Sequence, residues 1–201
     1  LSSAAIPASA PSVVSSVLTG TDGLTRTGGD LTLETPNFYT GATAATGATA
    51  VIKAAFLSDT SSSLGASPLS DPANLTLGSG ATLEFNGSTN TSTARSFTIG
   101  GSAGIAATGA GTLEFTSASQ LATTGAAPAL TLTANNAGTN RFAASLVDGN
   151  TGLANLAING TGTWVIGTGA NRFKNDVRIE AAAGATIGLE NASLPSGATL
   201  A

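Results

Sequence analysis

A short pattern recurs along this chain, and it limits what the chain can fold into more than any other feature. The pattern combines closely spaced glycines, an apolar residue at every second position, and a turn followed by Asn and an aromatic residue. Its clearest copy spans residues 158–173, a second spans residues 24–41, and a third begins at residue 108 without the aromatic end. Repetition of short alternating segments indicates stacked β structure.

Composition agrees with an ordered repeat protein. The chain has 201 residues, which suits one or two ordinary domains or one elongated array. Only 9 % of the residues are charged, whereas 41 % are hydrophobic. Disordered chains combine low hydrophobicity with high net charge, so we expect a packed structure instead.

Two all-β architectures fit the pattern, a β-solenoid and a β-sandwich. The alternating segments are short, the turns are rich in glycine, and aromatic residues make up 4 % of the chain. Sandwich strands are usually longer and contain more aromatic residues, so we favour the β-solenoid. We expect rungs of about 20 to 25 residues over residues 23–201, with an N-terminal arm or cap over residues 1–22. Leu, Ile, Val and Phe should stack inside, with Thr, Ser and Asn outside or at corners.

The repeat resembles a known family. Residues 24–33 read Leu-Thr-Arg-Thr-Gly-Gly-Asp-Leu-Thr-Leu, and residues 37–41 read Asn-Phe-Tyr-Thr-Gly. They are similar to the autotransporter-associated β-strand repeat of large secreted bacterial passenger proteins. Residues 80–83, Gly-Ala-Thr-Leu, look like its usual continuation, and the copy at 158–173 has Trp164 in a Leu position. The resemblance implies a right-handed parallel β-helix, export, and an extracellular or cell-surface location.

Several kinds of chemistry are disfavoured by the residues that are missing. The sequence has no His and no Cys, which excludes a Ser-His-Asp triad, a Cys nucleophile and the usual zinc and iron sites. We therefore predict no cofactor and no metal site. The net charge is −4 and the seven basic residues are scattered, so we expect no nucleic-acid partner. No apolar run approaches the roughly 20 residues of a membrane-spanning helix, so no membrane span is predicted.

Acidic residues are the remaining catalytic candidates. Glu34, Glu84 and Glu114 each follow Thr-Leu, which suggests equivalent positions in three rungs. Two suitably spaced carboxylates could hydrolyse a glycosidic bond. We favour the alternative that each is a solubilising Glu facing outward after an inward Leu. Residues 28–30, Gly-Gly-Asp, match a fragment of a calcium-binding repeat, but we interpret them as a tight turn.

A second set of candidates could contact a ligand. The densest charge cluster contains Arg172, Lys174, Asp176 and Arg178, which alternation places on one strand face. We name Arg172, Lys174 and Arg178 as candidate contacts for a glycan or a partner, and a solvated face is the competing interpretation. Aromatic rings can also stack on sugars, and the candidates are Trp164, Phe38 and Tyr39. For Trp164 the competing interpretation is a place in the core.

These observations favour a structural or adhesive role outside the cell. The last residues, 197–201, repeat a strand pattern without an evident polar cap. We therefore expect either a longer array or end-to-end self-association, with the chain as a subunit of a filament or surface assembly. We predict that the protein is not an enzyme. The alternative hypothesis is a carbohydrate-binding or carbohydrate-cleaving β-helix protein.

Overall fold

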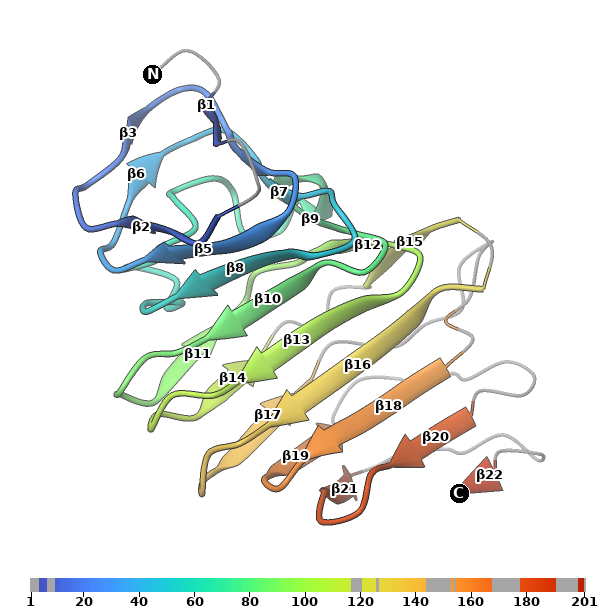
Figure 1. Ribbon diagram of the computed structural model, residues 1–201. Coiled ribbons are helices and arrows are strands. Elements are labelled where there is room, and N and C mark those ends of the chain that lie inside the picture. The colour runs from blue at the N-terminus through green and yellow to red at the C-terminus, as the bar shows by residue number, and fades with distance from the viewer. Residues whose placement is uncertain are drawn as a thin grey trace.

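The chain forms a stack of short parallel β-strands in the computed structural model. The structure describes residues 4–6, 10–116, 121–125, 127–143, 153, 155–167, 178–190 and 199–200. Within them the helical content is a short 3-10 helix, Pro72–Asn74. The strands pair parallel with the preceding and following rungs, and the two ends of the chain lie at opposite ends of the stack (Figure 1). The fold is therefore a β-solenoid, and the sandwich alternative is wrong.

Four sheets form the three sides of the solenoid, and consecutive strands move from one side to the next. The first face comprises β1 (Ala4–Ile6), β4 (Leu24–Arg26), β7 (Thr43–Ala45), β9 (Leu75–Gly78), β12 (Thr98–Gly100) and β15 (Ala122–Thr124). The long face comprises β2 (Ser12–Val14), β5 (Gly29–Leu33), β8 (Ala50–Ala54), β10 (Thr82–Phe85), β13 (Ala103–Ala107), β16 (Ala129–Ala134), β18 (Asn155–Gly160), β20 (Arg178–Ala181) and β22 (Thr199–Leu200).

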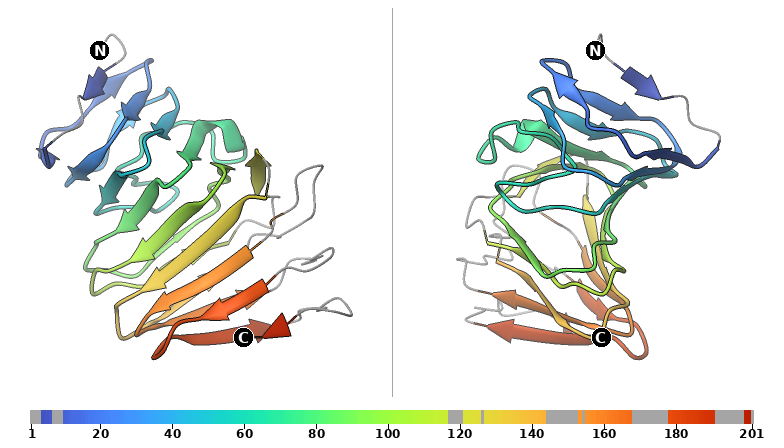
Figure 2. Two further views of the ribbon diagram at one scale, coloured as in Figure 1. Left: turned by 45° about the vertical axis from the view of Figure 1, so that its right-hand side comes forward. Right: turned by 90° about the vertical axis from the view of Figure 1, so that its left-hand side faces the viewer.

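The third face is built from two separate sheets. The larger comprises β11 (Thr91–Thr93), β14 (Leu113–Phe115), β17 (Thr139–Phe142), β19 (Thr163–Gly167) and β21 (Thr186–Glu190). The smaller pairs β3 (Thr19–Gly20) with β6 (Phe38–Tyr39), which follow the first two strands of the long face in the chain. Figure 2 shows the long face continuing past both sheets from one end of the molecule to the other.

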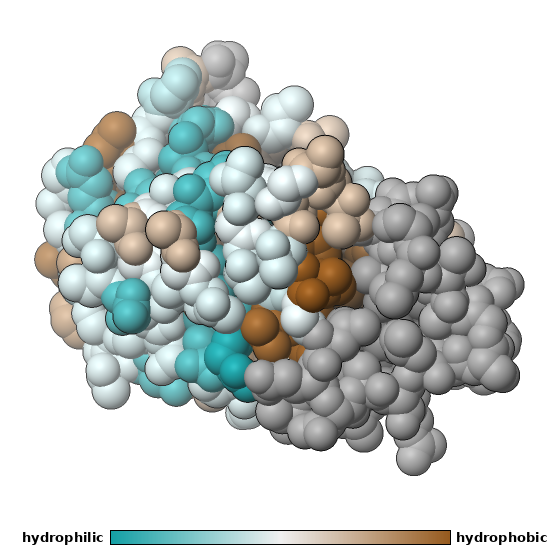
Figure 3. Space-filling model, turned by 90° about the horizontal axis from the view of Figure 1, so that it is seen from below, coloured by the Kyte–Doolittle hydropathy of each residue, from teal (hydrophilic) through white to brown (hydrophobic). Residues whose placement is uncertain are grey.

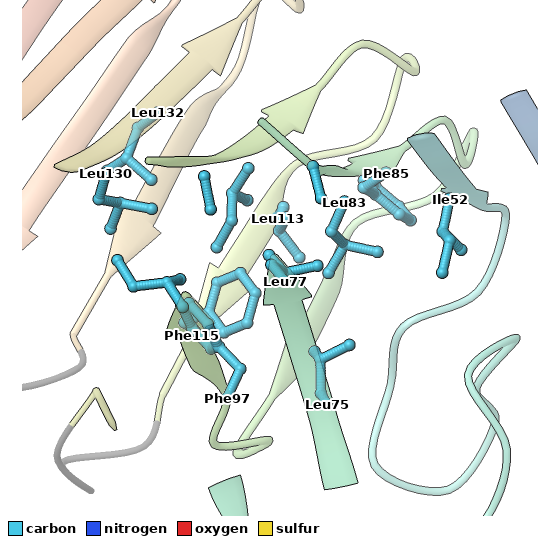
Figure 4. Packing of buried hydrophobic residues seen from close by; sticks show 14 of the residues in the cluster. Ile52, Leu75, Leu77, Leu83, Phe85, Phe97, Leu113, Phe115, Leu130 and Leu132 are labelled. Atoms are coloured by element: carbon cyan, nitrogen blue, oxygen red, sulfur yellow. The ribbon is translucent and has the colours of Figure 1, made fainter. Parts of the chain in front are cut away.

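Alternation within each strand produces ladders of stacked side chains. On the long face one inward ladder consists of Leu31, Ile52, Leu83, Ile105, Leu132 and Ile158, all of them 0–1 % exposed. The residues between them along each strand face outward. Figure 4 shows Ile52, Leu83 and Leu132 among the labelled core residues. The core predicted from alternation is confirmed, because each rung buries its apolar residues against its neighbours.

Three phenylalanine rings cluster in the core. Phe115 of β14 lies between Phe97 and Phe142, with ring centroids 5.5 and 5.6 Å away. The Phe97 and Phe142 rings meet edge to face at 6.1 Å. Phe97 and Phe115 lie side by side close to Leu77 (Figure 4). Tilted pairs of this kind stabilise a core beyond their burial, so these rings tie the first face to the third.

Buried asparagines connect the rungs at the corners. The Asn37 side chain accepts a hydrogen bond from Leu18 N–H in the preceding rung and donates one to the Ser63 carbonyl. Asn140 similarly accepts from Leu113 N–H and donates to the Thr163 carbonyl. Each side chain thus satisfies backbone groups that the turn would otherwise leave unpaired.

Rung length varies more than the sequence suggested. On the long face Leu31 pairs with Ile52, 21 positions later, but Ile52 pairs with Leu83, 31 positions later. The longer rung contains residues 57–72, where Leu57 and Ser62 form an isolated antiparallel bridge. This segment stands where the other rungs have a third-face strand. The expected range of 20 to 25 residues is wrong for this rung because it counted repeats without allowing for an insertion.

The first residues of the described chain also belong to the stack. Strands β1, β2 and β3 pair in parallel with β4, β5 and β6, respectively. Arg26, which points inward from β4, is fully buried and donates to the carbonyls of Ala10, Gly29 and Asp30. Its guanidinium therefore holds the segment before β2 against the start of β5. The predicted boundary between residues 22 and 23 stays a prediction.

Candidate functional site

The predicted basic cluster lies largely beyond the part of the chain that the structure describes. Arg172, Lys174 and Asp176 are outside the described residues. Arg178 begins β20, where it pairs with Asn155 of β18 and Thr199 of β22. The contact surface proposed for these side chains stays a prediction.

The three glutamates do not occupy equivalent positions. Glu84 lies in β10 of the long face, level with Lys53 of β8. The residue of the preceding rung at that level is Thr32, and Glu34 comes two positions after it. Glu114 lies in β14 on the third face. The predicted equivalence is wrong because the triplet Thr-Leu-Glu specifies only that Leu points inward, which holds on any face.

Each of these carboxylates is bound to a group other than a carboxylate. Glu34 Oε2 accepts from Ser15 Oγ at 2.6 Å, and Glu84 Oε1 accepts from Thr108 Oγ1 at 2.6 Å. Glu114 Oε1 lies 3.4 Å from Arg141 Nε. Among the described residues no group of three or more acidic side chains forms a candidate metal site. The geometry favours outward, solubilising glutamates.

A lysine links two acidic residues on the outer side of the long face. Lys53 Nζ lies 2.8 Å from Asp30 Oδ2 and 3.7 Å from Glu84 Oε2. The hydrogen bond to Asp30 raises the pKa of Lys53. Gly29, just before Asp30, has a φ of +63°, which suits the tight turn expected for residues 28–30. Asp30 is thus an ion-pair partner at the start of β5.

The candidate aromatic residues separate by burial. Trp164 is fully buried on the inner side of β19, which confirms a place in the core. Tyr39 is also buried, and its hydroxyl shares a hydrogen bond of 2.6 Å with Thr43 Oγ1. Burial raises the pKa of Tyr39 to about 12. Phe38 is 58 % exposed. Of the three rings, Phe38 is the one available at the surface.

A buried arginine holds the inserted segment. Arg95 is 3 % exposed, and its guanidinium donates to Ser67 Oγ at 2.9 Å and to the Gly65 carbonyl at 3.1 Å. Burial lowers the pKa of Arg95. From the other side, Asp59 accepts from Thr93 Oγ1 and Ala94 N–H. The polar groups of this cluster are used in fixing residues 57–72 to the next rung, so they form a structural anchor.

The outer side of the long face is hollowed over β13. The hollow has a volume of about 260 Å³ and is lined by Gly80, Thr82, Ser102, Ala103, Gly104, Thr131 and Thr133. It arises because β13 presents Gly104 outward between Thr82 of β10 and Thr131 of β16. Sequence reasoning missed it. The available signal was a glycine at an outward strand position, and that signal indicates a hollow only when the register of the three strands is known.

Elsewhere the described surface has few strongly apolar areas. Viewed from below, it is mostly pale or teal, with small brown areas (Figure 3). The large hydrophobic side chains that are exposed are Val13, Val17, Phe38 and Phe56. No helix in the described residues is long and apolar enough to cross a membrane.

Part of the chain is similar to a known bacterial adhesin. A stretch of 121 residues, 59 % of the chain, is 40 % identical to the adhesin BmaC autotransporter of Brucella suis biovar 1 (strain 1330). The chain spans 4 % of the length of that protein. No protein-family model matches the chain. No solved structure matches it either. The similarity and the β-solenoid together fit a protein of the autotransporter-passenger kind in a coarse sense.

Proposed function

We propose that this chain is part of an extracellular adhesive β-solenoid presented at a bacterial cell surface. The observation that supports the proposal most is the similarity to an adhesin autotransporter in a chain that folds as a parallel solenoid. Stacked rungs create long lateral faces, and extended surfaces of this kind serve binding in repeat proteins. The outer positions of the strands are the part of the molecule that a partner would meet.

Adhesion of coated beads tests this role. Beads bearing the folded chain should attach to cultured cell monolayers more than beads bearing the same chain after heat denaturation. The denatured chain is a matched control because it has the same composition and charge without the lateral faces. Equal attachment of both kinds of bead would contradict the proposal.

The proposed role is not enzymatic. Support comes from Glu34, Glu84 and Glu114, whose carboxylates bind a hydroxyl or a basic group and do not contact one another in the described part of the chain. Paired carboxylates are what glycoside hydrolysis requires. Release of reducing sugar from polysaccharides by the purified chain, abolished in Glu84→Gln, would contradict this part of the proposal.

We also propose that such solenoids associate end to end. Rungs join through parallel backbone pairing, as β5 does with β2 on one side and with β8 on the other, and the same pairing would join one solenoid to the next. An unpaired strand edge is a template for another strand. Light scattering and electron microscopy should show rods that lengthen with concentration. A constant monomer mass at all concentrations would contradict end-to-end association.

A further inference from the structure

The hollow over β13 has a defined floor and two walls. Register places Thr82 of β10, Gly104 of β13 and Thr131 of β16 side by side on the outer surface. Neighbouring strands are about 4.8 Å apart, so the walls stand about 10 Å from each other. An ideal Cβ on Gly104 would lie 2.8 Å from Thr82 Oγ1, so the floor exists because residue 104 has no side chain.

The hydroxyls of this hollow are available for a ligand. Within the part of the chain that the structure describes, the side chains of Thr82, Ser102, Thr131 and Thr133 form no hydrogen bond to protein groups. Other threonines of the solenoid do, for example Thr98 with the Pro72 carbonyl and Thr108 with Glu84. A hydroxyl can donate one hydrogen bond and accept two. The walls therefore offer several groups that both donate and accept.

Size and charge narrow the class of ligand. The volume of about 260 Å³ lies below the range of about 300–1,000 Å³ of pockets for drug-sized molecules, which suits a single small ring. The described lining residues are all uncharged, and nearby Glu84 already binds Thr108 and faces Lys53. A neutral ligand with several hydroxyls and a partly apolar face matches these walls and the glycine floor.

We propose that the hollow binds one hexopyranose unit of a surface glycan. The hydroxyls of the sugar would exchange hydrogen bonds with Thr82, Thr131 and Thr133, and its C–H face would lie on Gly104. This inference rests on the proposed adhesive function and names the chemical class of its partner.

Titration of the isotope-labelled full chain with methyl hexopyranosides, followed by NMR, tests the proposal. The probes are methyl α-D-glucopyranoside, methyl α-D-mannopyranoside and methyl β-D-galactopyranoside. At least one should shift the amide signals of Gly104, Thr131 and Thr133 in a saturable way. Absence of saturable shifts at these positions with all three probes would overturn the proposal.

Variants separate the hollow from the rest of the surface. Gly104→Thr fills the hollow between Thr82 and Thr131, and it should weaken sugar binding by more than about tenfold. The matched control is Ala44→Thr, which places the same side chain between Thr25 and Thr76 on the first face and should bind as the original chain does. Melting curves show whether both variants fold. Equal binding by the two variants would overturn the assignment.

A second pair of variants removes hydroxyls and keeps side-chain volume. Thr131→Val combined with Thr133→Val should weaken sugar binding, whereas Thr25→Val combined with Thr76→Val should not.

Bead adhesion distinguishes the sugar site from the adhesive function on which it rests. Beads that adhere although no probe binds would overturn the sugar site alone, and sugar binding without adhesion would contradict the adhesive function. Inhibition of adhesion by the binding probe would identify a glycan on the cell as the source of the sugar.

Discussion

At the scale of single residues, buried asparagines explain why this residue belongs to the repeat. Asn37 lies between β5 and β6 and Asn140 near the start of β17, and each joins the rung before it to the rung after it. Asn140 also exchanges hydrogen bonds with Asn136 at 2.8 and 3.1 Å. An amide suits such a corner because it can both donate and accept.

Replacing Asn140 by alanine should destabilise the fold by about 1–3 kcal/mol, because Leu113 N–H would remain buried without a partner. Urea unfolding followed by circular dichroism measures the change. Asn159→Ala is the control, since Asn159 is exposed at the end of β18. Equal midpoints for the two variants would contradict the bridging role.

Tyr39 should titrate well above an ordinary tyrosine. It is the single tyrosine of the chain, so the ultraviolet absorbance of phenolate reports its ionisation alone. Burial raises its pKa to about 12, from an ordinary value near 10. Because the folded state holds this proton more tightly, its contribution to stability is complete below about pH 10 and is lost as the pH rises toward about 12. Ionisation of the folded protein near pH 10 would contradict the burial of the ring.

At the scale of elements, residues 57–72 replace a strand without interrupting the stack. The Ser63 carbonyl of this segment accepts a hydrogen bond from Asn37 of the rung before it. Arg95 of the rung after it donates to Ser67 and to the Gly65 carbonyl. Gly65 has a φ of +76°, and an ideal Cβ there would lie 2.7 Å from the Tyr39 ring, so glycine allows the close approach. The insertion is therefore part of the packed structure.

Arg95→Ala should cost about 1–3 kcal/mol and make residues 57–72 sensitive to protease, because the Gly65 carbonyl loses a buried donor. Lys53→Ala is the comparison, since it removes a surface ion pair that contributes about 1 kcal/mol at most. Limited proteolysis with mass spectrometry locates the cut sites. If both variants are cut at the same rate, Arg95 is not the anchor.

At the scale of the whole molecule, stability should be shared between neighbouring rungs. Each inner residue contacts mainly the rungs on either side, so a central rung is buried on two sides and a terminal rung on one. Hydrogen exchange should therefore be slowest in β10, β13 and β16 and faster in β2 and β3. Uniform protection along the chain would indicate an all-or-none structure and contradict this picture.

Much of this architecture could be predicted from the sequence, and the failures share a cause. Alternation in residues such as Leu31, Leu83 and Leu132 identified the inner ladders, because inward and outward positions are a local property. The faces on which Glu84 and Glu114 lie were not predictable, because they depend on the number of residues in each turn between consecutive strands. The hollow at Gly104 requires the register of three strands.

The register of the stacked strands also determines which side chains share the proposed lateral surface. Electron paramagnetic resonance tests that register most directly. Thr32 and Asn159 lie on one outward ladder, joined through Lys53, Glu84, Ala106 and Thr133. The chain contains no cysteine, so Thr32→Cys with Asn159→Cys accepts two spin labels at known positions. Five inter-strand steps predict a narrow distance distribution centred near about 24 Å. A broad distribution, or one centred far from this value, would contradict the stacked solenoid.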